Sequence, residues 1–161
     1  MLHLEYRTTA ILVRIPAAPR RVLTAELLDN LTAAIAYIGP AQPIVLTGTG
    51  SVFLPDLDPV DGPARAAASV RLPRVLSALR THPLPVIAAI NGDAVGAGYI
   101  LAEAADIRVM SAGAIQPSSP TAGRYHVPEA LDAGLIEHRC EPENLIEFAL
   151  KQADGLRYAR S

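Results

Sequence analysis

Residues 85–110 read PVIAAINGDAVGAGYILAEAADIRVM, and this stretch decides the fold class. It begins with a short apolar run, PVIAAI, which predicts a buried strand, and it ends with a second strand, DIRVM. Between the two, Gly96 and Gly98 flank Ala97 and predict a tight turn that opens a helix. A strand, a turn, a helix and another strand in this order indicate an α/β fold.

The flanking sequence continues the alternation of strands and helices. Polar and apolar residues alternate over residues 2–7 and 10–15, which predicts two strands, and PIVLT at 43–47 predicts a third. Helical spacing of apolar residues predicts helices over residues 24–37, 64–80, 95–105, 127–133 and 143–154. Pro73 is expected to kink the second of these helices or to split it in two. Residues rich in proline, glycine and serine predict loops at 51–63 and 111–125.

The composition of the 161-residue chain predicts one domain with a substantial core. Half of the residues are hydrophobic and 19% are charged, against a usual value of about 25%, which favours a well-buried or oligomeric protein. The formal net charge of −2 gives no electrostatic case for a nucleic-acid partner or for a membrane surface. A single cysteine, no signal-peptide pattern and no apolar run of roughly 18 residues make the cytoplasm the expected location.

Two loops each follow a short apolar strand, at residues 53–58 and at residues 91–98. In open α/β sheets, ligands bind at the carboxyl ends of the strands. Gly96 and Gly98 allow the backbone to approach a ligand closely. One backbone N–H from each loop would therefore form a two-donor cradle for a carbonyl oxygen that becomes negatively charged.

Two segments, VLTGTGSVFLPDLDP and LRTHPLPVIAAINGDAVGAGYILAEAADIRVMSAGA, resemble the enoyl-CoA hydratase/isomerase (crotonase) family. The family pattern is V-L-T-G-x-G-x-x-F-x-x-G-x-D, followed by P-V-I-A-A-V-N-G-x-A-x-G-G-G-x-x-L-A-x-x-x-D-I-R-V. A weaker match, ALDAGLIEHRCEPE, resumes at residues 130–143. The resemblance implies an α/β, crotonase-like fold of repeated strand-strand-helix units, with residues 1–161 forming a single domain.

The resemblance also implies an acyl-CoA thioester site. The backbone N–H groups of Leu57 and Ala97 fall at the two oxyanion donor positions of the family. Contacts to the acyl-CoA or to its phosphates are implied for residues of the two loops and for two arginines: Pro55, Asp56, Asp58, Gly96, Gly98, Arg20 and Arg21. Coenzyme A would be part of the substrate, and we expect neither a separate cofactor nor a metal, because no His/Cys/Asp cluster has ligand spacing.

The chain departs from the family pattern at its reactive positions and in its length. Ile100 stands where the hydratases carry their first catalytic glutamate, and residues 114–120 contain no carboxylate where the second is expected. Asp56 replaces the family glycine, and a carboxylate there would oppose oxyanion formation unless it turned outward. The resemblance implies a shortened loop at residues 118–126, residual C-terminal helices over residues 127–161 and a fold truncated in that helical region.

His126, in the shortened loop beside Tyr125, is the best candidate for a replacement acid or base. Asp93 and Tyr99 are further candidates, although a turn cap and a packed helix residue are their ordinary structural alternatives. Four other residues are expected to be structural or at the surface, namely His82 at the surface and Glu103, Asp106 and Cys140 as structural residues.

Three functions remain open from the sequence. The first is an enzyme that acts on acyl-CoA or a related thioester by isomerisation, decarboxylation or thioester hydrolysis, without two-glutamate hydration. The second is a non-catalytic subunit that supports an active homologue, and the third is a catalyst whose substrate is not linked to CoA. The resemblance further implies a homo-oligomer based on trimers, or a complex with a homologue.

Overall fold

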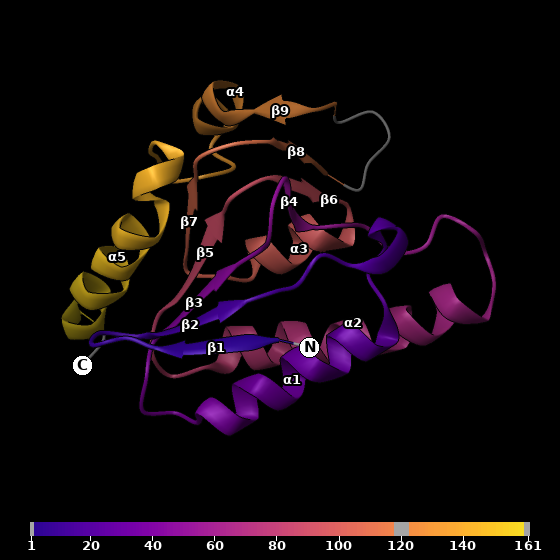
Figure 1. The fold of residues 1–161 in the computed structure, drawn as a ribbon, viewed down its shortest axis with the longest axis horizontal. Helices are drawn as coiled ribbons and strands as arrows, with labels where there is room; N and C mark the ends of the chain where they lie inside the picture. Colours follow the sequence, from indigo (N-terminus) through magenta and orange to yellow (C-terminus); the bar gives the residue numbers. More distant parts are fainter. Residues whose placement is uncertain (1, 118–122, 160–161) are drawn as a thin grey trace.

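The computed structural model describes residues 2–117 and 123–159, which fold into two sheets and surrounding helices (Figure 1). The larger sheet has the strand order β1 (His3–Tyr6), β2 (Ile11–Arg14), β3 (Ile44–Thr47), β5 (Val86–Ile90), β7 (Ile107–Met110) and β10 (His138–Arg139). The smaller sheet has the strand order β4 (Val52–Leu54), β6 (Asp93–Val95), β8 (Ala114–Gln116) and β9 (Tyr125–His126). The helices are α1 (Ala25–Ile38), α2 (Pro63–Thr81), α3 (Ala97–Glu103), α4 (Val127–Asp132) and α5 (Leu145–Ala159), with short 3-10 turns η1 (Pro19–Arg21) and η2 (Pro142–Asn144).

The larger sheet is parallel apart from the antiparallel β1–β2 hairpin. Its central strands are short apolar runs because helices cover both faces (Figure 1). Leu46 and Ala88 pack in the core cluster that includes residues of α1, α2 and α3, whereas Val45 and Ile87 pack against α5. Because successive side chains along each strand point to opposite faces of the sheet, each strand contributes residues to two separate cores.

Two helices lie together on one face of the larger sheet (Figure 1). Helix α1 begins after Thr24, its N-cap residue, whose Oγ1 accepts a hydrogen bond from the Leu27 N–H at 3.1 Å. Helix α2 runs through Pro73 as one helix, so the expectation of a helix split in two was wrong. Pro73 is exposed, and the buried Ala68, Val75 and Leu79 anchor the helix on both sides of it.

The smaller sheet lies largely inside segments that were expected to be loops. Strands β4 and β8 fall within residues 51–63 and 111–125, and β6 falls within the glycine turn. Each of these strands has only three residues, too few to show an alternating pattern in the sequence. Residues 118–122 of the predicted shortened loop lie outside the described residues.

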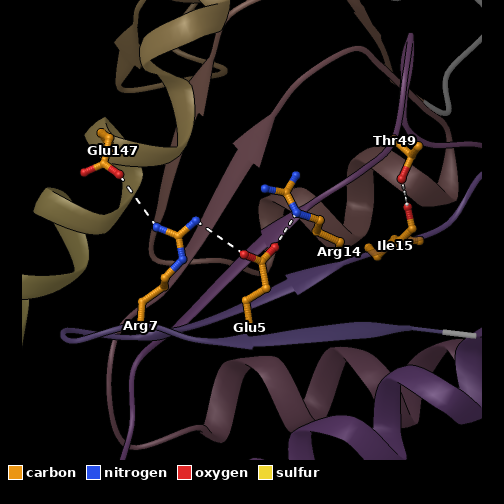
Figure 2. Close-up of polar contacts among 6 residues, drawn as sticks. All are labelled: Glu5, Arg7, Arg14, Ile15, Thr49 and Glu147. Atoms are coloured by element: carbon orange, nitrogen blue, oxygen red, sulfur yellow. Dashed lines mark hydrogen bonds and ion pairs between the residues drawn. The ribbon is translucent and has the colours of Figure 1, made fainter.

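A chain of ion pairs connects the first hairpin to α5 (Figure 2). The Arg14 Nε donates to Glu5 Oε2 at 2.6 Å, and Arg7 lies 3.4 Å from Glu5 and 3.7 Å from Glu147. The hydrogen bond from Arg14 lowers the pKa of Glu5 below its ordinary value, and Arg7 adds to the effect.

Among the described residues, no helix combines the length and the apolar character that a membrane span requires.

Candidate functional site

Two backbone amides converge on one oxygen atom where β4 and β6 end. The Leu57 N–H donates to Asp56 Oδ1 at 2.7 Å, and the Ala97 N–H donates to the same oxygen at 2.9 Å. We call these two N–H groups the amide cradle. Although Leu57 and Ala97 are far apart in the sequence, the two predicted donors point at one common position, and the carboxylate of Asp56 occupies it.

Glycines allow the two loops to approach each other this closely. Gly96 has a φ of +53°, in the region that side-chain-bearing residues rarely adopt, and a Cβ built on it would overlap the Asp56 carboxylate. A Cβ built on Gly98 would overlap the Leu54 carbonyl. The two glycines that predicted the turn therefore also allow α3 to lie this close to β4.

Asn91 joins the loop of residues 91–98 to residues 48–52, a role that sequence reasoning did not assign. Its Oδ1 accepts a hydrogen bond from the Gly48 N–H at 2.8 Å, and its Nδ2 donates to the carbonyl oxygens of Gly50 at 3.0 Å and Val52 at 3.3 Å. A polar residue directly after an apolar strand was the available signal, because only an amide side chain both donates and accepts in this way.

A hollow of about 250 Å³ adjoins the cradle. It is lined by Arg21, Val22, Val52, Pro55, Asp56, Leu57, Pro59, Asp93 and Val95. The 3-10 turn η1 lies beside it because the Leu23 N–H donates to the Asp56 carbonyl at 2.8 Å. Arg20 lies 3.9 Å from the Asp58 carboxylate, so the structure brings both predicted arginines to the loop of Pro55 to Asp58.

The resemblance places the hydratase glutamates at Ile100 and within residues 114–120. Ile100 is a partly exposed residue of α3. Residues 114–116 form β8, whose exposed Gln116 accepts a hydrogen bond from the Gly96 N–H at 2.8 Å through its carbonyl. Residues 118–120 lie outside the described residues.

Among the replacement acid/base candidates, Asp93 lines the hollow. Its Oδ1 accepts from the Ala114 N–H at 2.9 Å and its Oδ2 lies 3.5 Å from Arg124. His126 lies exposed on β9, which is separated from β6 by β8 in the smaller sheet. The structure therefore brings Asp93 to the cradle's hollow and leaves His126 on a more distant strand.

Tyr99 is buried in α3, and this burial, with the nearby Glu103 carboxylate, raises its pKa above the ordinary value. Its position agrees with the packing alternative.

Asp106 accepts a hydrogen bond from the Val86 N–H at 2.7 Å, as a structural residue would. Burial and the neighbouring acidic groups Glu141 and Glu143 raise the pKa of Cys140.

His82 is buried, with 6% of its surface exposed, so the expectation of a surface residue was wrong. Its Nε2 lies 2.7 Å from the Gln42 carbonyl oxygen. This contact gives the buried imidazole nitrogen a hydrogen-bond partner at the junction between α2 and β5, and burial of the nitrogen without a partner would be unfavourable. Within residues 2–117 and 123–159, no group of three or more His, Cys, Asp or Glu side chains is arranged to hold a metal.

Comparison with known proteins supplies the family. The family model described as enoyl-CoA hydratase/isomerase matches residues 11–118. The probable enoyl-CoA hydratase echA6 of Mycobacterium tuberculosis is 43% identical over 95 residues, which make up 57% of this chain and 39% of that protein. A probable enoyl-CoA hydratase of Rhodobacter capsulatus is 41% identical over 98 residues, or 57% of this chain and 38% of the relative. The matches thus span well under half the length of these relatives.

Solved structures show the same fold. Pseudomonas aeruginosa DspI superposes with a TM-score of 0.83 at 25% identity, and the superposition covers 99% of this chain and 80% of that one. An enoyl-CoA hydratase of Bacillus anthracis, at 22% identity, gives a TM-score of 0.81 with the same two coverages. The family model covers most of the chain, and the fold is that of a crotonase. This chain belongs to the enoyl-CoA hydratase/isomerase family.

Proposed function

We propose that this chain binds an acyl-CoA thioester with the carbonyl oxygen in the amide cradle, and that it does not perform two-glutamate hydration. The observation that carries the proposal is the convergence of the Leu57 and Ala97 amides, at 2.7 and 2.9 Å, on a single oxygen. Donors fixed in this way stabilise an oxygen on which negative charge develops, and each contributes about 2.7–4 kcal/mol to the transition state.

The hollow beside the cradle supports this ligand class. Its apolar lining, which includes Val22, Val52 and Val95, suits an acyl chain. Arg21 on the same wall and the exposed Arg20 nearby carry the positive charge that would meet CoA phosphates. Coenzyme A enters the proposal as part of the substrate, with no separate cofactor.

The chemistry proposed for this site requires fewer carboxylates than hydration does. Ile100 cannot transfer a proton, whereas Asp93 lies at the hollow and is a candidate acid or base. His126 remains a second candidate. Isomerisation, decarboxylation and thioester hydrolysis are the reactions that suit an oxyanion cradle with one proton-transferring group.

A second candidate function is a non-catalytic subunit that supports an active homologue. The observation in its favour is that Asp56, and not a free space, faces the two amides. Either function is compatible with assembly into a trimer-based homo-oligomer or into a complex with a homologue. Light scattering tests the assembly, because a scattering mass equal to one chain would contradict the homo-oligomer.

Calorimetric titration with crotonyl-CoA, acetyl-CoA and free CoA tests the proposed ligand. We expect both thioesters to bind more tightly than free CoA, because only they carry the carbonyl oxygen. A lack of heat at millimolar ligand would contradict the thioester site. Assays for hydrolysis of crotonyl-CoA, isomerisation of a 3-enoyl-CoA and decarboxylation of malonyl-CoA then separate the two functions. Turnover in any of the three that Asp93→Asn or His126→Ala abolishes supports the enzyme, and binding without turnover in all three supports the subunit.

A further inference from the structure

We propose that Asp56 controls entry to the amide cradle, because its carboxylate is an internal occupant that a thioester must displace. The inference rests on the proposed function for the identity of the ligand. The occupancy itself rests only on the geometry: one carboxylate oxygen accepts both N–H groups that face the cradle.

The position of the carboxylate excludes a ligand oxygen from the same point. A carbonyl oxygen that accepted from Leu57 and Ala97 would have to stand where Asp56 Oδ1 stands. Gly96 packs directly against the Asp56 carboxylate, so the carboxylate fills the cradle on its glycine side as well. Entry of a thioester therefore requires the Asp56 side chain to rotate out of the cradle.

The displacement is unfavourable for a neutral ligand. Hydrogen bonds from an N–H to an ionised carboxylate are roughly twice as strong as those to a neutral carbonyl. A thioester would exchange two such bonds for two weaker ones, whereas an oxygen that carries a full negative charge would restore their strength. The occupied cradle thus disfavours ground-state thioesters more than it disfavours an oxyanion.

The Asp56 side chain can rotate while its backbone stays in place. The Asp56 backbone is held independently of its side chain, because its carbonyl accepts from the Leu23 N–H at 2.8 Å. The hollow next to the cradle has Arg21 and Asp93 in its lining. Arg21 offers a displaced carboxylate an opposite charge, and Asp93 is the acidic group that would repel it.

The first test needs no ligand and uses amide NMR of the full chain at a single pH. In the wild type the Leu57 and Ala97 N–H groups both donate to Asp56 Oδ1, and Asp56→Ala removes that acceptor from both. Both amide protons should therefore move upfield in Asp56→Ala, whereas the Ala114 amide proton, which donates to Asp93, should stay unchanged. A Leu57 or Ala97 amide proton that does not respond to Asp56→Ala would overturn the proposal.

The second test measures crotonyl-CoA affinity by calorimetry in Asp56→Ala, Asp56→Asn and a matched control. The control is Asp61→Asn, which removes one negative charge from an exposed position of the same loop. We expect Asp56→Ala to bind at least tenfold more tightly than the wild type, equivalent to about 1.4 kcal/mol. Asp56→Asn should be intermediate, since its amide oxygen still accepts but carries no charge, and Asp61→Asn should match the wild type.

The two tests separate this inference from the proposed function. If both amide protons respond to Asp56→Ala but no variant binds a thioester, the internal occupant stands and the proposed ligand is wrong. If the wild type and Asp56→Ala bind crotonyl-CoA equally, the carboxylate does not control entry and the inference is wrong. Equal gains in Asp56→Ala and Asp61→Asn would also overturn it, because they would reflect net charge alone.

Discussion

Replacement of Asn91 by alanine should destabilise the fold by removing the side chain that joins the loop of residues 91–98 to residues 48–52. The two shortest hydrogen bonds of this side chain, with Gly48 at 2.8 Å and Gly50 at 3.0 Å, contribute about 1 kcal/mol each. The longer bond to Val52, at 3.3 Å, adds less. We therefore expect a loss of about 2 kcal/mol, or a fall in Tm of about 4–8 °C for a chain of this size.

Urea unfolding followed by circular dichroism measures this loss. Asn144→Ala, at an exposed position of η2, is a matched control that should stay within about 0.5 kcal/mol of the wild type. Asn91→Asp should not rescue stability, because a carboxylate would face the Gly50 and Val52 carbonyls without a proton to donate. A loss below about 0.5 kcal/mol in Asn91→Ala would refute the reasoning that these bonds hold the two segments together.

Two further predictions concern stability away from the site. The lowered pKa of Glu5 means that its contribution is present above the ordinary value of 4.5 and is lost as the pH falls through the lowered value. The free energy of unfolding of the wild type should thus fall more steeply than that of Glu5→Gln below about pH 4.5. The difference should be at most about 1 kcal/mol, because the ion pair is exposed. Urea unfolding across this pH range measures it, with Glu141→Gln as the control, and parallel curves for wild type and Glu5→Gln would contradict the prediction. Pro73→Ala should stabilise the chain by about 1 kcal/mol, because it restores a helical N–H inside α2. An unchanged Tm would count against that account.

The parts of the fold that the sequence predicted are those with a recognisable hydrophobic pattern within one continuous segment. The apolar runs that became β3 and β5 and the capped helix α1 are examples. Strands β4 and β6 could not be predicted, because they pair with each other through only two aligned positions and depend on the loops being brought together. His82 was misplaced for a related reason, since its partner Gln42 is 40 residues away.

The resemblance placed Leu57 and Ala97 as the oxyanion donors, and that role stays a prediction. In the structure the two N–H groups converge on the Asp56 carboxylate, an occupant that was not predicted. The orientation of Asp56 depends on a side-chain rotamer and on how closely Gly96 approaches it, neither of which has a sequence signal. Asn91 was missed because its partners lie at residues 48–52, about 40 positions earlier.

The long separation between the two halves of the cradle has a kinetic consequence. We expect Leu57 and Ala97 to meet once β3 has paired with β5, with Val45 opposite Ile87, because parallel pairing over such a separation closes slowly during folding. Until then the Asp56 carboxylate would have the neighbouring Leu57 amide but not the Ala97 amide. Hydrogen-exchange protection of the Ala97 amide during refolding should therefore mark the moment at which the central strands join.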